Sequence, residues 1–527
     1  MEGSDHRVSP YSRFARAALA VPVVFVGLFV ALPTVVALRH GFDVTSVFTD
    51  GQLREVLWFT AWQAAVSTAL TTVLGVPVAW LLSRHEFTGR RAVRALTLVP
   101  FVLPTVVVGL AFRALFPGGL RTGIAPLIIA HVFLNVAVVV RIVGARWEMQ
   151  PFGFEEAAAT LGAPPFRRFT TVTWPMLRGA IVAAAGLVFM YCFTTFGAAR
   201  VLAGPTHPTT ETEIYRLAVF TGDERSAAAL AVVQILFVGI VLASTSGRGS
   251  RGIAPALPRQ LHSTARRTRI GVVAGATAVA SFFALPLAGL ALRSVRVGQG
   301  MSFSAWRAAF HDDSASANVA SALVTSLRVA LVASVIATLA GVLLSFARVH
   351  AQRAQERVIA IACEVLPVVV SAVVLGLGFI LAFRNDPIDW RGTWWILPVA
   401  HAVVALPLVS RTVTAAMQQI PGGLRDASAT LGASPARTLI SIDIALLRRP
   451  IAAAASLAAL VSLGEFGASS LLTRRGSETL TMAIGRLLGR PGDLLQSQVF
   501  VSASVLGILC LLLVWLVDVL SARNWAQ

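Results

Sequence analysis

Long apolar runs separated by short polar loops make up most of this chain. A membrane-spanning helix needs about 20 consecutive apolar residues, and roughly twelve such runs follow one another along the sequence. Barrel strands would be shorter and would alternate apolar with polar residues, which these runs do not. We therefore predict an all-α polytopic membrane protein with spans near residues 17–38, 57–82, 95–116, 124–143, 179–199, 227–245, 270–292, 320–346, 358–382, 394–414, 450–472 and 498–520.

The chain contains an internal repeat at an offset of 270 residues. Segment 154–181 combines an Ala-rich stretch, a glycine, prolines and paired arginines, and segment 424–451 repeats this plan. Ala, Glu and Leu favour helix, and a glycine before a proline is typical of a helix that ends in a left-handed cap. Each segment therefore predicts a short helix that ends near Gly162 or Gly432. The same offset relates Glu156 to Asp426, His131 to His401, Arg141 to Arg411, Phe196-Gly197 to Phe466-Gly467 and Arg216 to Arg486.

The distribution of arginine predicts the topology of these two homologous halves. Arginine is concentrated in alternate loops, which marks the cytoplasmic side of a membrane protein. We predict a first half at 1–245, a basic cytoplasmic linker at 246–269 and a second half at 270–527. Loops 144–178 and 415–449, which carry the repeated short helix, and both chain termini then lie in the cytoplasm. An even number of spans per half makes the repeats parallel.

Composition supports this interpretation. Hydrophobic residues make up 56% and charged residues 13% of the 527 residues, with a mean hydropathy of +0.75, whereas soluble proteins carry about 25% charged residues. The net charge of +19 comes from arginine, because the chain has no lysine; we attribute it to membrane orientation and expect no nucleic-acid partner. Cys192, Cys363 and Cys510 fall within apolar runs, so we expect inert thiols and no metal site.

The repeated loop resembles a known motif. Glu156-Ala157-Ala158, three residues, Gly162, nine residues and then Val172-Thr173-Trp174-Pro175 resemble the EAA loop of permeases in binding-protein-dependent ABC importers. The second copy is Asp426-Ala427-Ser428 with Gly432. It departs from the family pattern at Asp426, where glutamate is usual, and at Ala445, where proline is usual. The helix and its glycine stop are kept in both copies.

The resemblance implies a type I importer permease fold, multi-pass in the bacterial inner membrane, in which the loop forms a coupling helix. It also implies two partner ABC ATPase subunits, which hold ATP and Mg, and an extracytoplasmic solute-binding protein. A phosphate-binding loop needs a lysine, so we expect no cofactor on this chain and no enzyme activity of its own. One chain with both halves resembles the branch that serves thiamine or ferric iron. The stretches 130–135 and 187–217 are most similar to the thiamine permeases.

Ionisable and polar residues within apolar runs are candidates for a substrate pathway, because they are costly in a membrane. Glu465 would suit a cationic substrate if it faces a central cavity, or it pairs with an arginine of a neighbouring helix. Glu364 is a second pathway candidate, or a solvated acid near the inner end of its span. His131 and His401 are expected to be equivalent scaffold residues. Further candidates for the pathway or for bridges between helices are Asn135, Tyr191, Thr194, Thr195 and Gln234.

Two further features leave alternatives open. Pro104 and Pro367 each follow Val-Leu and precede a glycine-containing apolar run, so we expect either matched broken helices beside a transport site or simple kinks. An ion-coupled secondary transporter would share the parallel six-span halves but would not need the two Ala-Gly loops. An intramembrane enzyme is a third possibility, but the carboxylates are isolated and no catalytic motif accompanies them. The leading hypothesis is an importer permease for thiamine, with ferric iron as the alternative substrate.

Overall fold

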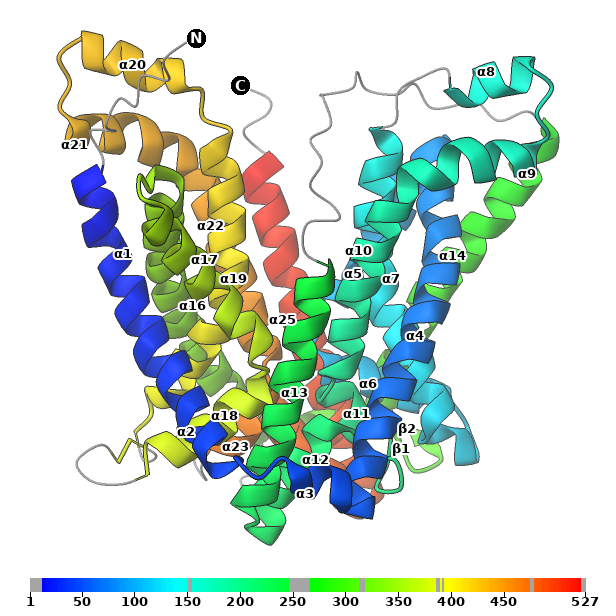
Figure 1. The fold of residues 1–527 in the computed structure, drawn as a ribbon. Coiled ribbons are helices and arrows are strands. Elements are labelled where there is room, and N and C mark those ends of the chain that lie inside the picture. The colour runs from blue at the N-terminus through cyan, green and yellow to red at the C-terminus, as the bar shows by residue number, and fades with distance from the viewer. Residues whose placement is uncertain are drawn as a thin grey trace.

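The computed structural model describes residues 12–149, 154–245, 266–311, 318–384, 389–390, 393–473 and 478–522. Nearly all of this part is helical, and its only strands, β1 (Arg296–Val297) and β2 (Gly300–Met301), pair as a short antiparallel hairpin (Figure 1). The predicted linker at 246–269 lies outside the described residues as far as 265, and helix α14 begins at Arg266.

The two halves have the same order of helices. The first half contains α1 (Ser12–Val26), η1 (Gly27–Ala31), α2 (Leu32–His40), α3 (Thr45–Thr49), α4 (Gly51–Arg84), α5 (Arg90–Val102), α6 (Thr105–Leu115), η2 (Gly118–Arg121), α7 (Ile124–Glu148), α8 (Phe154–Thr160), α9 (Pro165–Arg168), η3 (Phe169–Thr173), α10 (Trp174–Phe193), α11 (Gly197–Leu202), α12 (Thr210–Arg216), η4 (Leu217–Thr221) and α13 (Glu224–Thr245). The second contains α14 (Arg266–Ser294), α15 (Ser304–His311), α16 (Val319–His350), α17 (Ala354–Val369), α18 (Ala372–Ala382), α19 (Ile396–Gln418), α20 (Gly422–Thr430), α21 (Pro435–Thr438), η5 (Leu439–Ile444), α22 (Ala445–Gly464), α23 (Gly467–Leu472), α24 (Leu480–Leu488) and α25 (Asp493–Ala522).

These helices confirm the predicted twelve-span plan, with one refinement. Among the described residues, ten helical stretches are long and apolar enough to cross a membrane. The third span of each half is instead a sharply bent pair of shorter helices. Helices α5 and α6 meet at 111°, and α17 and α18 meet at 99°. Counting each bent pair as one span gives twelve, six in each half.

The bends lie where broken helices were expected, but the proline pairing was wrong. The bend follows α5 at Leu103-Pro104 and follows α17 at Val370-Ser371. Helices α6 and α18 are therefore related by an offset of 267 (372 − 105), not 270. At this offset Pro367, inside α17, matches Pro100 inside α5, and the counterpart of Pro104 is Ser371. The loop that follows the bent span is longer in the second half (383–395) than in the first (116–123), so the offset of 270 applies only after it. The expected pairing rested instead on the repeated Val-Leu-Pro.

Each half packs around one central pair of helices. Helix α4 packs against α7 and α10, and α16 packs against α19 and α22 in the same way. Two glycines allow the close approach: a Cβ at Gly75 would lie 2.8 Å from the side chain of Val139, and one at Gly341 would lie 2.5 Å from that of Val409. Small residues at such crossings let membrane helices pack backbone to backbone.

The first helix of each half packs against the other half. Helix α1 lies against α16 and α17, and α2 lies against α18, although all three partners belong to the second half (Figure 1). Conversely, α14 packs against α5 and α6 of the first half. An ion pair with an N–O distance of 2.9 Å between Arg16 and Glu356 joins α1 to α17. The linker therefore separates the two halves in sequence, but the packed groups of helices do not follow this division.

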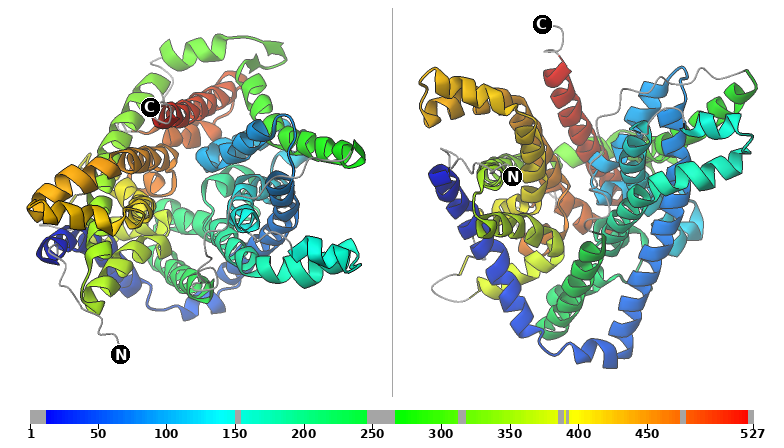
Figure 2. Two further views of the ribbon diagram at one scale, coloured as in Figure 1. Left: turned by 90° about the horizontal axis from the view of Figure 1, so that it is seen from above. Right: turned by 45° about the horizontal axis from the view of Figure 1, so that its top comes forward.

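The two packed groups of helices converge at one end of the molecule and diverge at the other (Figure 1). Helices α8 and α20 lie at the diverging end, on opposite edges of the molecule (Figure 2). Helix α1 starts and α25 ends at this same end. The repeated loops therefore form two separate projections, one on each group.

Candidate coupling helices and translocation cavity

The short helices predicted in the two repeated loops are present as α8 and α20. Gly162 and Gly432 follow them with φ angles of +80° and +76°, which confirms the expected left-handed caps. Ala163 N–H donates to the carbonyl of Ala158 at 3.0 Å, as in a Schellman motif. The predicted loops 144–178 and 415–449 are shorter than expected, because α7 continues to Glu148 and α19 to Gln418.

The motif residues form an exposed surface on each short helix. Glu156, Ala157, Asp426 and Ala427 are exposed, while Ala158 and Ser428 are half-buried against the loop behind them. The hydroxyls of Ser428 and Thr438 are 2.8 Å apart. Leu161 and Leu431, which are equivalent at the 270 offset, are 87% and 88% exposed. Each short helix is thus followed by a leucine that is open to solvent, at equivalent positions of the two halves.

The residues next to the motif attach each short helix to the span that follows it. Glu155 accepts a hydrogen bond from Thr173 and forms an ion pair with Arg84. At the equivalent positions of the second half, Arg425 donates from Nε at 2.9 Å and from Nη2 at 2.7 Å to one carboxylate oxygen of Asp443. We missed these residues in the sequence, although 155 + 270 = 425 and 173 + 270 = 443 relate them. In the first half the acidic residue lies on the short helix, whereas in the second half it lies on the span that follows. This exchange of residue types obscured the equivalence of the two positions.

A cavity of about 320 Å³ lies between the two halves. Equivalent positions from both halves line it, including Thr194 with Gly464, Thr195 with Glu465, and Phe196 with Phe466. The rings of Phe196 and Phe466 are 5.1 Å apart between centroids. The structure thus brings together four pathway candidates, Asn135, Thr194, Thr195 and Glu465, with His131 and Tyr191 beside them.

Two glycines hold the Phe-Gly turns against the bent spans. A Cβ at Gly467 would lie 3.0 Å from Val373 of α18, and one at Gly197 would lie 3.0 Å from the backbone nitrogen of Val106 of α6. Helices α11 and α23 therefore begin directly against the bends. This contact explains why Phe-Gly recurs at the 270 offset and why the bends border the cavity.

Glu465 is buried at the cavity wall and does not pair with an arginine among the described residues. Its carboxylate accepts backbone N–H bonds from Ala468 at 2.9 Å and Ser469 at 3.0 Å, at the start of α23. It also lies 3.3 Å from Nε2 of His401. The alternative of an arginine partner is therefore wrong, and histidine with backbone amides takes that role.

Glu211 is a second buried carboxylate of the cavity that we missed in the sequence. It lies on α12 and is 1% exposed, and Gln234 donates a hydrogen bond to it. Burial raises the pKa of Glu211 to about 7, against opposing hydrogen bonds from Ser371 and Gln234. Residue 211 falls in a segment that we predicted as an outer loop. Because charged residues are common in loops, this glutamate did not stand out in the sequence as a candidate for the cavity. Gln234 supports this site instead of lining the cavity.

Glu364 lies away from the cavity in an ion-pair network. Arg348 donates to one carboxylate oxygen, and Nε of Arg411 donates to the other at 2.8 Å. The residue is 5% exposed, so the expectation of a solvated acid was wrong. The 270 offset had already related Arg411 to Arg141, but no acidic partner could be assigned to it from sequence.

The two equivalent histidines are buried and have hydroxyl partners. Nδ1 of His131 lies 3.2 Å from the hydroxyl of Ser67. The two ring nitrogens of His401 each lie 2.8 Å from a serine hydroxyl, of Ser462 and Ser469. Within the ranges that the structure describes, no group of three or more His, Cys, Asp or Glu residues is placed to hold a metal ion. Cys192, Cys363 and Cys510 are free and buried.

Comparison with known proteins agrees with this architecture. The chain matches the family model of the binding-protein-dependent transport system inner membrane component at residues 71–248 and again at 337–525. It is 28% identical over 500 residues to the thiamine transport system permease protein ThiP of Brucella suis biovar 1 (strain 1330), covering 91% of this chain and 89% of the relative. Identity to the protein of the same name from Escherichia coli (strain K12) is 27% over 512 residues, covering 92% of each chain.

A shorter relative matches one half of the chain. Identity to the sulfate transport system permease protein CysT of Escherichia coli (strain K12) is 30% over 256 residues, which cover 44% of this chain and 92% of the relative. One half here thus corresponds to a whole permease there. The double family match and the repeated helices show that the chain belongs to the binding-protein-dependent inner membrane components of ABC importers, with two permease halves fused in one chain.

Proposed function

We propose that this chain is the transmembrane subunit of an ATP-driven importer that carries thiamine or its phosphate esters into the bacterial cytoplasm. Two ATPase subunits dock on α8 and α20, whose end of the molecule faces the cytoplasm together with both termini. ATP and Mg bind to those subunits. An extracytoplasmic binding protein delivers the substrate at the converging end. The names of the two full-length relatives support thiamine as the substrate.

The observation that carries the substrate proposal is the cavity with two buried carboxylates, Glu211 and Glu465. Thiamine has a permanent positive charge on its thiazolium ring, and a buried carboxylate stabilises a cation in a site that excludes water. The aromatic rings of Phe196, Phe466 and Tyr191 line the same cavity. Aromatic faces attract organic cations, so the lining fits a flat cationic ring.

The same lining fits ferric iron less well. A hard metal ion prefers several oxygen ligands, whereas the carboxylates of Glu211 and Glu465 are already engaged by Gln234 and by His401 with backbone amides. The rest of the lining is mostly aromatic and aliphatic. We therefore favour the organic cation over iron.

The attachment of the short helices supports a coupling role. Since Arg425 is ion-paired with Asp443 at the start of the span that continues into α22, a displacement of α20 moves that span with it. Glu155 and Thr173 connect α8 to α10 in the same manner. Closure of two ATPase subunits would then bring the diverging groups of helices together, a rigid-body change of the kind that opens and closes transporters.

Uptake by proteoliposomes that contain this chain, its ATPase and the loaded binding protein tests the proposal. We expect labelled thiamine to accumulate only with ATP on the ATPase side. The double variant Glu211→Gln and Glu465→Gln should insert normally but lose most of this uptake. Accumulation driven by an ion gradient without ATP would instead identify a secondary transporter. Uptake of ferric iron but not thiamine would overturn the substrate while keeping the importer.

A further inference from the structure

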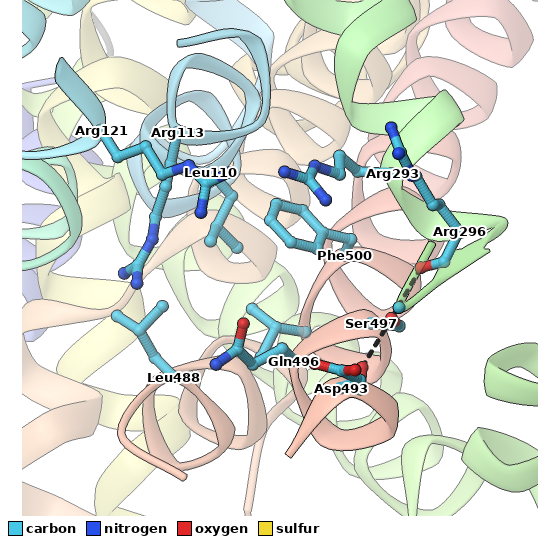
Figure 3. A pocket seen from close by; sticks show the side chains of 12 residues that line it. Leu110, Arg113, Arg121, Arg293, Arg296, Leu488, Asp493, Gln496, Ser497 and Phe500 are labelled. Carbon is cyan, nitrogen blue, oxygen red and sulfur yellow. Dashed lines mark hydrogen bonds between the residues drawn. The ribbon is translucent and has the colours of Figure 1, made fainter. Parts of the chain in front are cut away.

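Four arginines gather in a second, smaller pocket that the transport proposal does not use. Arg113 of α6, Arg121 of η2, Arg293 of α14 and Arg296 of β1, which we call the arginine pocket, surround a cavity of about 90 Å³. Figure 3 shows Arg113 and Arg121 on one side of it and Arg293 and Arg296 on the other. The pocket is separate from the translocation cavity, because Arg113 lies eight residues, about 12 Å, beyond Thr105 along α6.

The arginine pocket holds more positive charge than its surroundings balance. Within the described part of the chain, Arg113, Arg121 and Arg293 form no ion pair or hydrogen bond, and Arg296 reaches only the side chain of Gln299. Arg121 lies close enough to Arg113 and Arg293 for their charges to repel. Asp493 is the only acidic residue in the lining. The site therefore has an excess of about three positive charges when empty.

Neither the shared fold nor the topology requires these arginines. Helices α6 and α18 are equivalent at an offset of 267, and at this offset Ile380 takes the place of Arg113 (113 + 267 = 380). The first half could therefore be built with an apolar residue there. The β1–β2 hairpin places the pocket toward the end of the molecule away from α8 and α20 (Figure 1), where the positive-inside rule predicts few arginines. A cluster that is unpaired, repulsive and topologically disfavoured needs another reason.

The chemistry of the arginine pocket fits a phosphate group. Guanidinium groups bind phosphate oxygens in a two-pronged geometry, and partial burial strengthens the bond. Arg113 and Arg293 are half-buried and lie on opposite sides of the pocket. Its floor is made by the apolar Leu110, Leu488 and Phe500. We propose that the arginine pocket binds the phosphate group of an anionic molecule, either an anionic lipid or a soluble phosphate.

The surface beside the arginine pocket is compatible with a lipid source. Helix α14 lies on the periphery of the molecule (Figure 2), and its outward side chains Leu285 and Leu292 are 54% and 61% exposed. Leu292 directly precedes Arg293. An acyl chain can therefore lie along α14 while its headgroup phosphate reaches the pocket. A soluble phosphate would need only the pocket itself.

Two measurements on the intact chain test the arginine pocket and distinguish the sources. Calorimetric titration of lipid-stripped protein in neutral detergent with inorganic phosphate measures the soluble ligand. Native mass spectrometry of protein released from nanodiscs with phosphatidylglycerol or phosphatidylcholine measures the retained lipid. We expect one of the two to bind, and the double variant Arg113→Gln and Arg293→Gln to weaken it about tenfold or more. Arg113→Lys with Arg293→Lys should weaken it less.

The matched control removes two exposed arginines elsewhere, Arg39→Gln and Arg225→Gln, and should leave binding unchanged. Retained phosphatidylglycerol without phosphate heat identifies a lipid, and phosphate heat without retained lipid identifies a soluble ligand; both support the site. Absence of both signals in the wild type overturns it, as does an equal loss in the control variant, which would indicate general charge attraction. None of these readouts depends on transport, so the site and the transport proposal can fail separately.

Discussion

At the scale of single residues, the two carboxylates of the cavity differ because their neighbours differ. Glu465 accepts two backbone N–H bonds at a helix start and lies beside His401, and each of these neighbours stabilises a negative charge. Glu211 has only side-chain donors, so burial dominates and raises its pKa to about 7. One carboxylate thus has a stabilised charge, and the other can change protonation near neutral pH.

The first prediction concerns the pH dependence that Glu211 imposes on uptake. With a pKa of about 7, its ionised fraction rises from about a tenth at pH 6 to about nine tenths at pH 8. Because only the ionised form attracts a cation, the apparent affinity for thiamine should be several-fold higher at pH 8 than at pH 6. Initial uptake rates at both pH values measure this. The variant Glu211→Gln should remove the difference.

Glu465 supplies an independent check at the same scale. Its negative charge is one of the causes that raise the pKa of Glu211. In the variant Glu465→Gln the affinity for thiamine should fall, and the midpoint of the remaining pH dependence should move to lower pH, since Glu211 then ionises more easily. A midpoint that stays in place would show that the two carboxylates do not interact.

At the scale of elements, the short helices α8 and α20 combine an exposed surface with a fixed attachment. Their glycine caps have positive φ angles and open space around the position of a Cβ. A side chain there is resisted by backbone strain and not by a clash. The attachment runs through Glu155 in one half and Arg425 in the other. A substitution of the capping glycine therefore alters the end of each short helix. A substitution in the attaching pair loosens the contact between that helix and the span that follows it.

Replacing both caps, Gly162→Val and Gly432→Val, tests the end of each helix. Each valine should cost about 1–3 kcal/mol of local backbone strain, so stimulation of the ATPase by substrate-loaded binding protein should fall while membrane insertion is kept. Gly222→Val is the matched control, because Gly222 has a φ of +70° and equal open space but follows η4, away from both short helices. Loss of stimulation in both variants would point to general instability.

A charge exchange tests the base of α20. Asp443→Ala leaves the half-buried Arg425 without its carboxylate partner and should lower the free energy of unfolding by about 1.5–3 kcal/mol. The melting temperature should therefore fall, and ATP hydrolysis should be coupled less tightly to transport. Restoration of coupling by the double variant Arg425→Asp and Asp443→Arg would show that the pair itself fastens the helix. If the double variant behaves like the single one, the ion pair is not what transmits movement.

At the scale of the whole molecule, the two halves are joined because the first helix of each half packs against the other half. Helix α1 packs on the second half and α14 packs on the first, so neither half as defined in sequence contains its full set of packing partners. The bent spans and Phe-Gly turns then meet at the cavity, where Phe196 contacts Phe466. The molecule therefore consists of two packed groups of helices, and each group contains helices from both halves of the chain.

Cross-linking tests this exchange. With Cys192, Cys363 and Cys510 replaced by serine and a protease site inserted at 246–265, Arg16→Cys and Glu356→Cys should be joined by a short bismaleimide, because the two side chains now form an ion pair at 2.9 Å. After proteolysis the halves should migrate as one band. Arg16→Cys alone is the control. Two separate bands from the double variant would place α1 on its own half.

The sequence by itself determined the membrane class, the repeat, the twelve spans and the two short helices with their glycine caps. These features depend on local hydrophobicity and backbone preference, which neighbouring residues carry. It also predicted Asn135, Thr194, Thr195 and Glu465 as polar residues in apolar runs, and the structure places all four at the cavity. The period of the repeat further indicated that Phe196 and Phe466 are equivalent.

Only the tertiary structure decided which partners these residues meet. Glu364 and Glu465 were both pathway candidates in the sequence, yet one lies between two arginines and the other beside a histidine and a helix start. Glu211 became part of the cavity because α12 folds inward from a segment with the composition of a loop. The exchange of α1 and α14 likewise depends on packing between segments far apart in the chain. A local sequence pattern does not encode contacts between segments that are far apart in the chain. The burial that these contacts create determines the protonation of the ionisable residues at each site.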